Sequence, residues 1–302
     1  MRLLTRSDFD GLACGALLTH LGLIDDLLFV HPKDIQDGKI IATSNDILAN
    51  IPYIPNCGLW FDHHSSESER LDFAITFQGI SRQADSAARL IYDYYGGEKI
   101  FPHLKEMIDY VDRVDSGKLT KDEILNPTGW ILLGFIMDPR TGLGRYRNFR
   151  ISNYDLMKQL LYLCNETRIS DILTNYDVQE RVSLYFSQNE IFKDMIKKHT
   201  TVYKNVILTD LRGVEEIYTG NRFLIYSLYP EQNISVWVVD GKNKQNCSIA
   251  VGYSILNRSA TVDVGSLLLK FGGGGHKQVG TCQVPYDDAN EVMQKIIEAC
   301  NK

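Results

Sequence analysis

The sequence predicts an α/β fold in which an N-terminal parallel-sheet domain and a smaller C-terminal α/β domain are joined by a long helix. The chain has 302 residues, which suits two domains of roughly 150 residues each. In the first half, short apolar runs alternate with segments of helical periodicity, as expected for a parallel sheet. After residue 200 the sequence becomes β-rich, with Gly and Asn turns, so we expect domains at 1–190 and 200–302.

In the N-terminal half, apolar strands run into polar turns or helices. The first strand is followed by a polar turn and then by apolar residues at helical spacing that end at Gly22. The expected strands are 1–5, Leu27–Val30, Lys39–Thr43 and Gly58–Phe61, and the expected helices are Gly11–Gly22, 83–95 and 103–114. Because these strands alternate with helices, we expect them to be parallel.

The C-terminal half begins with helical sequence. Residues 153–200 contain little Pro or Gly, and Asp177–His199 is expected to be the long helix that joins the domains. Beyond it we expect strands at Val202–Leu211, Phe223–Tyr229, Ile234–Val239, Cys247–Leu256 and Val279–Val284, and helices at Val264–Phe271 and Asp288–Cys300.

Composition restricts the partners and the compartment. The net charge is −6, whereas a protein that coats duplex DNA is normally basic, so any nucleic-acid partner should be short. The six cysteines form no C-x-x-C pair, which favours reduced thiols in a cytoplasmic protein. The N-terminus becomes acidic too early for a signal peptide, and no apolar run approaches the ~18 residues of a membrane span.

The candidate site consists of acidic and imidazole side chains that follow predicted strands or end a predicted helix. Ligands of open parallel sheets bind outside the carboxyl ends of the strands. Asp8 and Asp10 are two residues apart in a turn and can face one site, and Asp112 and Asp115 share a helix face. The full set is Asp8, Asp10, Asp46, Asp62, His63, His64, Asp112 and Asp115.

A site with this many carboxylates indicates divalent cations, because unpaired carboxylates repel one another. Carboxylate and imidazole ligands together suit manganese or a similar first-row ion better than an all-oxygen magnesium site. Two such ions roughly 3.5–4 Å apart would polarise a phosphoryl group and generate a hydroxide nucleophile. Taken singly, each motif has a structural alternative: a helix cap, a hydrogen-bonded histidine pair or a solvated helix face. Their conjunction is more specific.

Four motifs together resemble the DHH phosphoesterase superfamily. They are Thr5–Ala13, Phe61–His64, Val111–Gly117 and Phe271–His276. The last, with Asn257–Ser259 and Val262–Val264 before it, is similar to the signature of the DHH-associated (DHHA) domain, and the whole looks closest to the exopolyphosphatase-related branch. The resemblance implies a two-metal phosphohydrolase that usually depends on Mn²⁺, with Mg²⁺ and Co²⁺ as alternatives. It makes 1–190 the catalytic domain and 200–302 the substrate-binding domain.

The resemblance also implies metal ligands. Asp8 would bind the first metal and Asp10 the second, and Asp46 would be the bridging carboxylate, with Asp34 and Asp37 as fallbacks.

His63 would bind the second metal, and either Asp112 or Asp115 would complete that site. His64 would lie near the phosphate, and Asp62 would orient the histidines.

One position departs from the family pattern. Many members carry histidine two residues before the first aspartate, and here that residue is Arg6. A guanidinium stays protonated and has no lone pair for a metal. The first metal site is then completed by water, weak or empty, or Arg6 contacts the substrate phosphate instead. Since its charge also opposes a second dication, our hypothesis is one firm metal and one weak metal.

Two further segments are candidates for substrate binding. In the glycine run before His276, backbone N–H groups can approach an anion, although a flexible hinge is the alternative. The expected contacts are Arg258, Gly273, Gly274, Gly275 and His276, with Lys277 as a further option. A basic cluster, Arg140, Arg145, Arg147 and Arg150, could attract an anionic substrate or form a solvated loop.

These inferences predict a cytoplasmic hydrolase of phosphodiester or phosphoanhydride bonds in small nucleotides. The candidate substrates are short oligoribonucleotides, cyclic dinucleotides and nucleoside bisphosphates. One alternative is an exopolyphosphatase or pyrophosphatase, and another is a nucleotide-binding protein whose catalysis is weakened by Arg6. The expected partners are a small phosphorylated substrate, including short single-stranded RNA, and no membrane, with a homodimer as an option.

Overall fold

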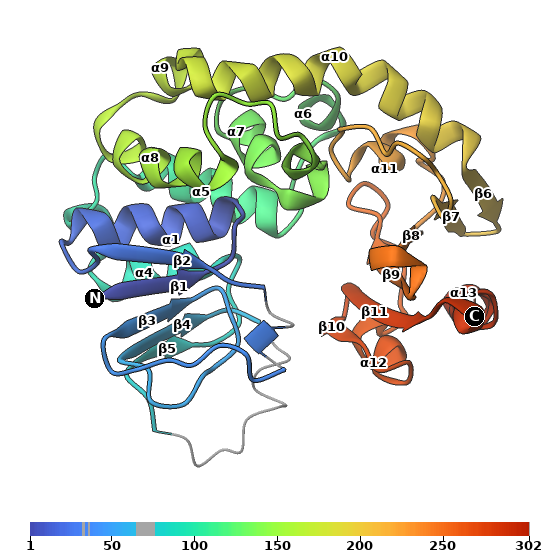
Figure 1. Ribbon diagram of the computed structural model, residues 1–302, viewed down its shortest axis with the longest axis horizontal. Helices are drawn as coiled ribbons and strands as arrows, with labels where there is room; N and C mark the ends of the chain where they lie inside the picture. Colours follow the sequence, from blue (N-terminus) through green and yellow to red (C-terminus); the bar gives the residue numbers. More distant parts are fainter. Residues whose placement is uncertain (32–33, 36, 65–75, 302) are drawn as a thin grey trace. The chain divides into compact units, whose positions relative to one another are not determined.

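The computed structural model describes residues 1–31, 34–35, 37–64 and 76–301 (Figure 1). They form two compact units, one of Met1–Lys118 with Pro127–Phe186 and the other of Leu119–Asn126 with Ser187–Lys302. The long helix α10 (Tyr176–Lys198) runs from the first unit into the second. The predicted α/β class with a long connecting helix is confirmed, and residues 119–126 group with the second unit.

Within the described residues, the first unit contains a five-stranded sheet in the order β2-β1-β3-β4-β5, and every neighbouring pair is parallel. Its strands are β1 (Arg2–Thr5), β2 (Asp26–Phe29), β3 (Asp46–Ala49), β4 (Leu59–Asp62) and β5 (Gly79–Ser81). Since parallel strands share one direction, the segments after β1, β3 and β4 meet at the same edge.

Helix α1 (Phe9–His20) is central to this unit and is buried from Phe9 to Leu18. Figure 1 shows it between the sheet and α8, and a Cβ at Gly15 would touch both Leu161 of α8 and Leu3 of β1. The other helices are α4 (Ala87–Tyr94), α5 (Lys105–Asp115), α7 (Gly129–Met137), α8 (Asn153–Glu166) and α9 (Ile169–Thr174), with short 3-10 turns at Gly97–Lys99, Pro139–Thr141 and Leu143–Arg145.

The strand expected at Lys39–Thr43 is wrong. Residues 39–45 have no strand, and β3 starts at Asp46. Ser44 and Asn45 form a turn directly before this strand, and the Asp46 amide closes the turn by donating to the Thr43 carbonyl at 2.9 Å. This shift moves Asp46 from the carboxyl end of a strand to the amino end of one.

The second unit contains, within the described residues, a six-stranded sheet in the order β10-β11-β9-β8-β7-β6, in which only β7 and β8 pair in parallel. Its strands are β6 (Thr200–Tyr203), β7 (Val206–Asp210), β8 (Ile234–Asp240), β9 (Asn246–Tyr253), β10 (Gly274–His276) and β11 (Val279–Pro285). Its helices are α6 (Lys121–Leu125), α11 (Leu224–Leu228), α12 (Val264–Leu269) and α13 (Ala289–Cys300), with a 3-10 turn at Tyr286–Asp288.

The strand expected at Phe223–Tyr229 is also wrong, because this segment forms α11. Asn221 Oδ1 accepts the Phe223 amide at 3.0 Å just before the helix begins. A short apolar run carries no periodicity that separates a buried strand from a buried helix.

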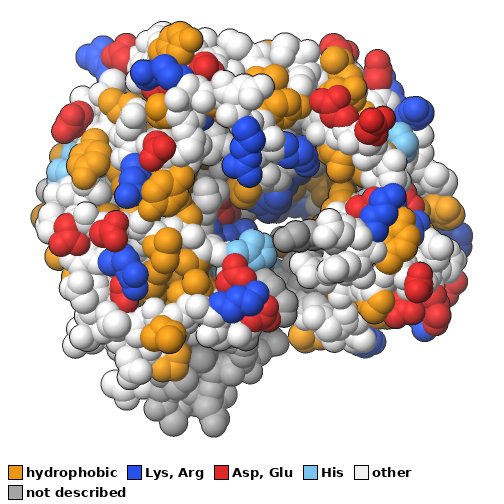
Figure 2. Space-filling model, in the orientation of Figure 1, with side chains coloured by type: hydrophobic (Ala, Val, Ile, Leu, Met, Phe, Trp, Pro, Cys, Tyr) orange, Lys and Arg blue, Asp and Glu red, His pale blue; other side chains and the backbone are white. Residues whose placement is uncertain are grey.

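Charged side chains of both signs are interspersed on the face shown in Figure 2. All six cysteines are free. Among the described residues, no helix combines the length and the apolar character that crossing a membrane requires.

Candidate metal centre

Asp10 lies in the first turn of α1, where the start of a second helix meets it. Its Oδ2 accepts the Ala87 amide at 2.9 Å and its Oδ1 accepts the Ala88 amide at 2.8 Å, both from the first turn of α4. Helix N-termini favour anions, so two helix starts hold this buried carboxylate in place. Burial nevertheless raises the pKa of Asp10 to about 7; His63 opposes the rise, while Asp115 and Asp8 add to it.

Glycine is required where α1 begins. A Cβ at Gly11 would lie 2.0 Å from the Arg6 carbonyl oxygen, so a side chain here would push α1 away from the loop before it. The close approach lets the Asp8 side chain cap the helix by accepting the Gly11 amide at 2.9 Å. Gly11 thus positions both Asp8 and Asp10.

His63 follows β4 and points one ring nitrogen at two carboxylates. Its Nδ1 lies 3.2 Å from the Ala84 carbonyl oxygen, which assigns the proton to Nδ1 and the lone pair to Nε2. Nε2 lies 3.7 Å from Asp10 Oδ2 and 3.4 Å from Asp115 Oδ2. Burial lowers the pKa of His63, but Asp115 and Asp10 outweigh it and the pKa is raised.

Asp10, His63 and Asp115 form the metal-binding group found among the described residues, with one ligand atom of each within 4.8 Å of the others. An ion roughly 2.0–2.2 Å from each ligand atom places those atoms about 3–4 Å apart. The separations of 3.7 and 3.4 Å from His63 Nε2, the carboxylate and imidazole chemistry and the assigned tautomer fit one divalent cation.

His64 is held by Asp62. Asp62 is buried at the end of β4, with Oδ1 2.8 Å from His64 Nδ1 and Oδ2 3.3 Å from the His64 amide nitrogen. The two histidine rings lie side by side with centroids 4.4 Å apart. Asp62 thus orients His64 directly, whereas the Ala84 carbonyl orients His63.

Comparison with known proteins then identifies the family. No protein-family model and no curated protein sequence matches the chain. The solved structure of the pGpG-specific phosphodiesterase PggH from Vibrio cholerae is 48% identical, with a TM-score of 0.79, and the match covers 99% of this chain and 98% of that one. This chain belongs to the DHH phosphoesterase family.

A more distant structure shares the fold of this DHH phosphoesterase. RecJ from Thermus thermophilus, solved with Mn²⁺, is 11% identical with a TM-score of 0.53, and the match covers 99% of this chain and 52% of that one. The family expected from the motifs is confirmed by the 48% identical phosphodiesterase.

Of the two alternatives on α5, the structure brings Asp115 to Asp10 and His63. The Asp112 carboxylate is bonded elsewhere: it accepts Ser86 Oγ at 2.6 Å and Arg89 Nε at 2.8 Å. Asp112 therefore ties α5 to the start of α4. Of the two candidate ligands on α5, the structure places Asp115, and not Asp112, in the metal-binding group.

Asp46 does not reach the site. It begins β3, and its carboxylate accepts Arg2 Nε at 2.7 Å, the Thr43 amide at 2.7 Å and Thr43 Oγ1 at 2.9 Å. These contacts lie at the amino ends of the strands, so Asp46 cannot bridge metals bound at the carboxyl ends. The fallbacks Asp34 and Asp37 instead face Lys39 Nζ at 2.9 and 3.2 Å.

The residue after β3 at the carboxyl edge is Asn50, which sequence reasoning missed. Its Nδ2 donates to Asp8 Oδ1 at 3.0 Å. The signal that could have found it is the apolar run Ile47–Ala49, which lies in β3 and ends directly before Asn50.

Arg140 lies in the turn after α7 and is oriented toward Asp138, whose Oδ1 accepts its amide at 2.8 Å and its Nε at 2.7 Å. Helix α7 packs directly on the start of α1, because a Cβ at Gly134 would lie 2.8 Å from the ring of Phe9. Burial lowers the pKa of Arg140, but Asp138 and then the more distant Asp8 and Asp115 outweigh it and raise that pKa.

Arg150, at the end of the basic cluster, has a structural partner. Its Nε and Nη2 donate to the two carboxylate oxygens of Asp177 on α10 at 2.8 and 2.5 Å. Arg150 uses both Nε and Nη2 in its ion pair, whereas Arg140 pairs with Asp138 through Nε, so of these two residues Arg140 is the better candidate for meeting an anionic substrate.

In the second unit the glycine run is largely a strand. Gly274–His276 form β10, which pairs with β11. Gly275 has φ +151°, and a Cβ there would lie 2.2 Å from the Val279 carbonyl oxygen; at Gly273 it would lie 2.3 Å from the Thr281 carbonyl oxygen. Close strand packing explains these glycines. Arg258 is exposed, with Nε 3.3 Å from the Ile255 carbonyl oxygen.

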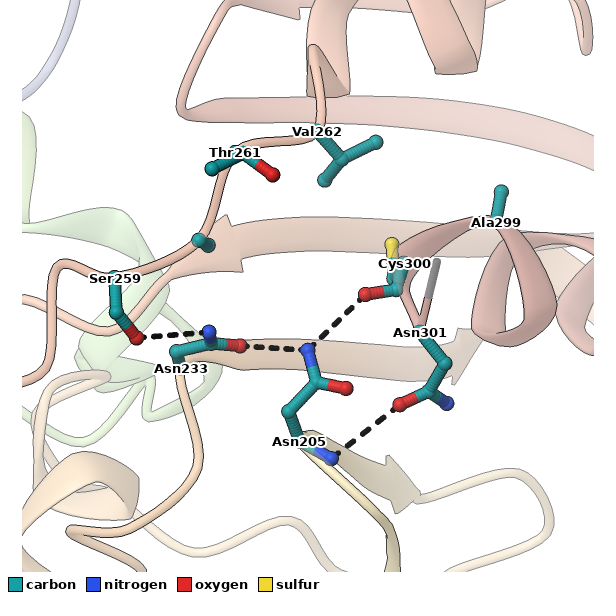
Figure 3. Close-up of a pocket in the computed structure, with 9 residues that line it drawn as sticks. Asn205, Asn233, Ser259, Thr261, Val262, Ala299, Cys300 and Asn301 are labelled. Atoms are coloured by element: carbon teal, nitrogen blue, oxygen red, sulfur yellow. Dashed lines mark hydrogen bonds between the residues drawn. The ribbon is translucent and has the colours of Figure 1, made fainter.

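A polar pocket of about 400 Å³ also lies in the second unit (Figure 3). Asn205 Nδ2 donates to Asn233 Oδ1 at 2.8 Å and to the Cys300 carbonyl at 3.1 Å, and Asn233 Nδ2 donates to Ser259 Oγ at 3.0 Å. Because these amides bond to one another and to the end of α13, they fasten the C-terminal helix to the sheet.

Proposed function

We propose that this DHH phosphoesterase is a divalent-metal-dependent phosphodiesterase that hydrolyses short linear oligoribonucleotides, with the dinucleotide pGpG as its preferred substrate. The observation that carries the proposal is the convergence of Asp10, His63 and Asp115 on one point, with a second oriented histidine beside them. The 48% identical relative is a pGpG-specific phosphodiesterase, which supports the proposed substrate class.

The mechanism begins with the ligands. Asp10, His63 and Asp115 would hold the cation, which when bound supplies a Lewis acid that polarises the phosphoryl group and acidifies water. Mn²⁺ is the ion we propose for this mixture of carboxylate and imidazole, with Mg²⁺ and Co²⁺ as the alternatives to compare.

The remaining residues act on the substrate. Asp62 fixes His64 through Nδ1, so the His64 Nε2 atom can exchange a proton with a phosphate or leaving-group oxygen. Arg6 and Arg140 present guanidinium groups that match phosphate oxygens and stabilise charge that develops during hydrolysis. In the second unit, we propose that Arg258, His276 and the backbone of Gly273–Gly275 contact the nucleotide.

The test is a substrate panel with the purified full-length protein and Mn²⁺. The panel contains pGpG, cyclic di-GMP, a five-nucleotide RNA, a nucleoside 3′,5′-bisphosphate, pyrophosphate and polyphosphate, and products are separated by chromatography. We expect pGpG to take up one water and yield two GMP faster than any other compound reacts. Turnover of polyphosphate or pyrophosphate without turnover of pGpG would contradict the proposal and favour the anhydride-cleaving alternative. Binding of pGpG without turnover would favour a nucleotide-binding protein.

The six free cysteines agree with a reducing compartment, and we propose that the protein acts in the cytoplasm.

A further inference from the structure

We infer that the centre holds a single divalent cation and that Arg6 and Asn50 occupy the place of a second one. This inference rests on the proposed function and deepens it. Asp10 already belongs to the three-residue metal-binding group, so Asp8 is the carboxylate of the Asp8–Asp10 motif that a second cation would use as its ligand. The three-residue metal-binding group does not include Asp8.

Both oxygens of Asp8 already have protein donors. Oδ1 accepts the Gly11 amide at 2.9 Å and the Asn50 side-chain amide at 3.0 Å. Oδ2 lies 3.2 Å from Arg6 Nε in an ion pair. Asp8 is buried, with 8% of its side chain exposed, so these donors stand where solvent or a cation would otherwise approach.

The two side-chain donors are poor neighbours for a cation. The Arg6 guanidinium has no lone pair to offer a metal and carries a full positive charge. If the Asn50 amide were flipped, its oxygen would face Asp8 Oδ1 and the two acceptors would repel each other. The hydrogen bond therefore keeps the NH₂ group, which cannot bind a cation, toward the carboxylate.

The sheet brings Arg6 and Asn50 together. Thr5 of β1 pairs with Ala49 of β3, so Arg6 and Asn50 are the next residues on neighbouring parallel strands. Asn50 has φ +58°, a left-handed conformation that Asn and Asp adopt more readily than most residues. Position 50 can therefore accept an aspartate, so the role of Asn50 can be tested by the substitution Asn50→Asp.

A guanidinium in this place supplies the charge that a second cation would supply. Arg6 uses Nε toward Asp8 and has 30% of its side chain exposed, so its terminal nitrogens can donate to a phosphate oxygen. Asp8 then acts as a positioning residue that holds Arg6, so that Arg6 and the bound cation would both contact the scissile phosphate.

The experiment counts Mn²⁺ in the absence of any nucleotide. Native mass spectrometry and titration calorimetry give the number of ions per chain, and electron paramagnetic resonance distinguishes an isolated Mn²⁺ from a spin-coupled pair. We expect one Mn²⁺ per wild-type chain with an uncoupled spectrum. Two bound ions with a coupled spectrum, or none, would overturn the inference whether or not the variants fold.

The double variant R6H/N50D restores a ligand at each position and removes the positive charge. We expect it to bind a second Mn²⁺, doubling the stoichiometry and producing spin coupling. The matched control Arg6→Gln removes the charge without adding an imidazole and should stay at one ion. A folded double variant that also stays at one would refute the role assigned to Arg6 and Asn50. Because no substrate is present, failure to cleave pGpG leaves this result intact, and the two proposals can fail separately.

Discussion

Asp112 and Asp115 lie one turn apart on α5, yet their carboxylates have different partners. Asp112 is bonded to Ser86 and Arg89 of neighbouring α4, whereas Asp115 Oδ2 faces His63. Sequence spacing cannot separate them, because the difference depends on donors that lie 26 and 23 residues away from Asp112 along the chain. The pair is therefore a matched test of the metal centre.

We expect Asp115→Asn to weaken Mn²⁺ binding by at least the ~10–100-fold that follows loss of a residue supporting a metal ligand. Asp112→Asn should leave Mn²⁺ affinity nearly unchanged and lower the free energy of unfolding by about 1–3 kcal/mol, because Arg89 loses a charged partner. Calorimetric titration with Mn²⁺ and urea unfolding measure the two effects. The reverse pattern would mean that Asp112 is the ligand.

His64 separates catalysis from metal binding. Since it is held by Asp62 and is not in the ligand group, His64→Asn should lower kcat by about 10²–10⁴-fold and leave Mn²⁺ affinity unchanged. Steady-state kinetics with pGpG, run beside an Mn²⁺ titration, check this. Loss of Mn²⁺ affinity in this variant would assign His64 to the metal instead.

At the scale of elements, sequence patterns predicted those strands and helices that carry their own local signals. The strand before Asp8, the strand before His63 and helices α4 and α5 lie close to the predicted ranges. The strand predicted at Lys39–Thr43 is absent. Ile40 and Ile41 favour a strand in the sequence, but Ile41 is 78% exposed and packs in no sheet. Sheet register decides such cases, and register depends on pairing with β1, which a single sequence does not display.

The corrected position of Asp46 gives it a structural role at the amino end of β3. Burial raises its pKa, but hydrogen bonds from Arg2 and Thr43 outweigh burial and leave the pKa below its ordinary value. A carboxyl group whose pKa is lowered by folding adds stability above its unfolded pKa of about 4, and this stability is lost as the pH falls through the folded pKa.

We therefore expect Asp46→Asn to reduce the free energy of unfolding by about 1–3 kcal/mol at pH 7, with kcat unchanged in the folded protein. The difference from wild type should shrink as the pH falls below about 4, where the unfolded carboxyl group takes up a proton, and through the lower pKa of the folded protein. Urea unfolding at pH 7 and at acid pH measures it. If the difference in the free energy of unfolding between wild type and Asp46→Asn stayed constant with pH, the Arg2–Asp46 ion pair would be excluded as its cause.

For the whole molecule, cation binding should stabilise one unit more than the other. The three proposed ligands lie in α1, directly after β4 and at the end of α5, all in the first unit. At a free Mn²⁺ concentration 100 times Kd, binding adds about 2.7 kcal/mol to the stability of the state that binds it. Hydrogen exchange followed by mass spectrometry should show Mn²⁺-dependent protection in those elements and little in β8 and β9. Protection confined to the second unit would place the cation elsewhere.

The second unit is assembled from two separated stretches of the chain, and this affects how the protein can be dissected. Helix α6 belongs to it although the chain then returns to the first unit, and the Ile124 carbonyl accepts Asn221 Nδ2 at 3.0 Å in a buried hydrogen bond. On the C-terminal part of α10, Gln188 Oε1 accepts the Thr219 amide at 2.7 Å. A fragment that starts at residue 200 would lack both partners and expose the loop before α11. Assigning tasks to each half is therefore better done with point substitutions in the intact polypeptide than by cutting it at the end of the long helix.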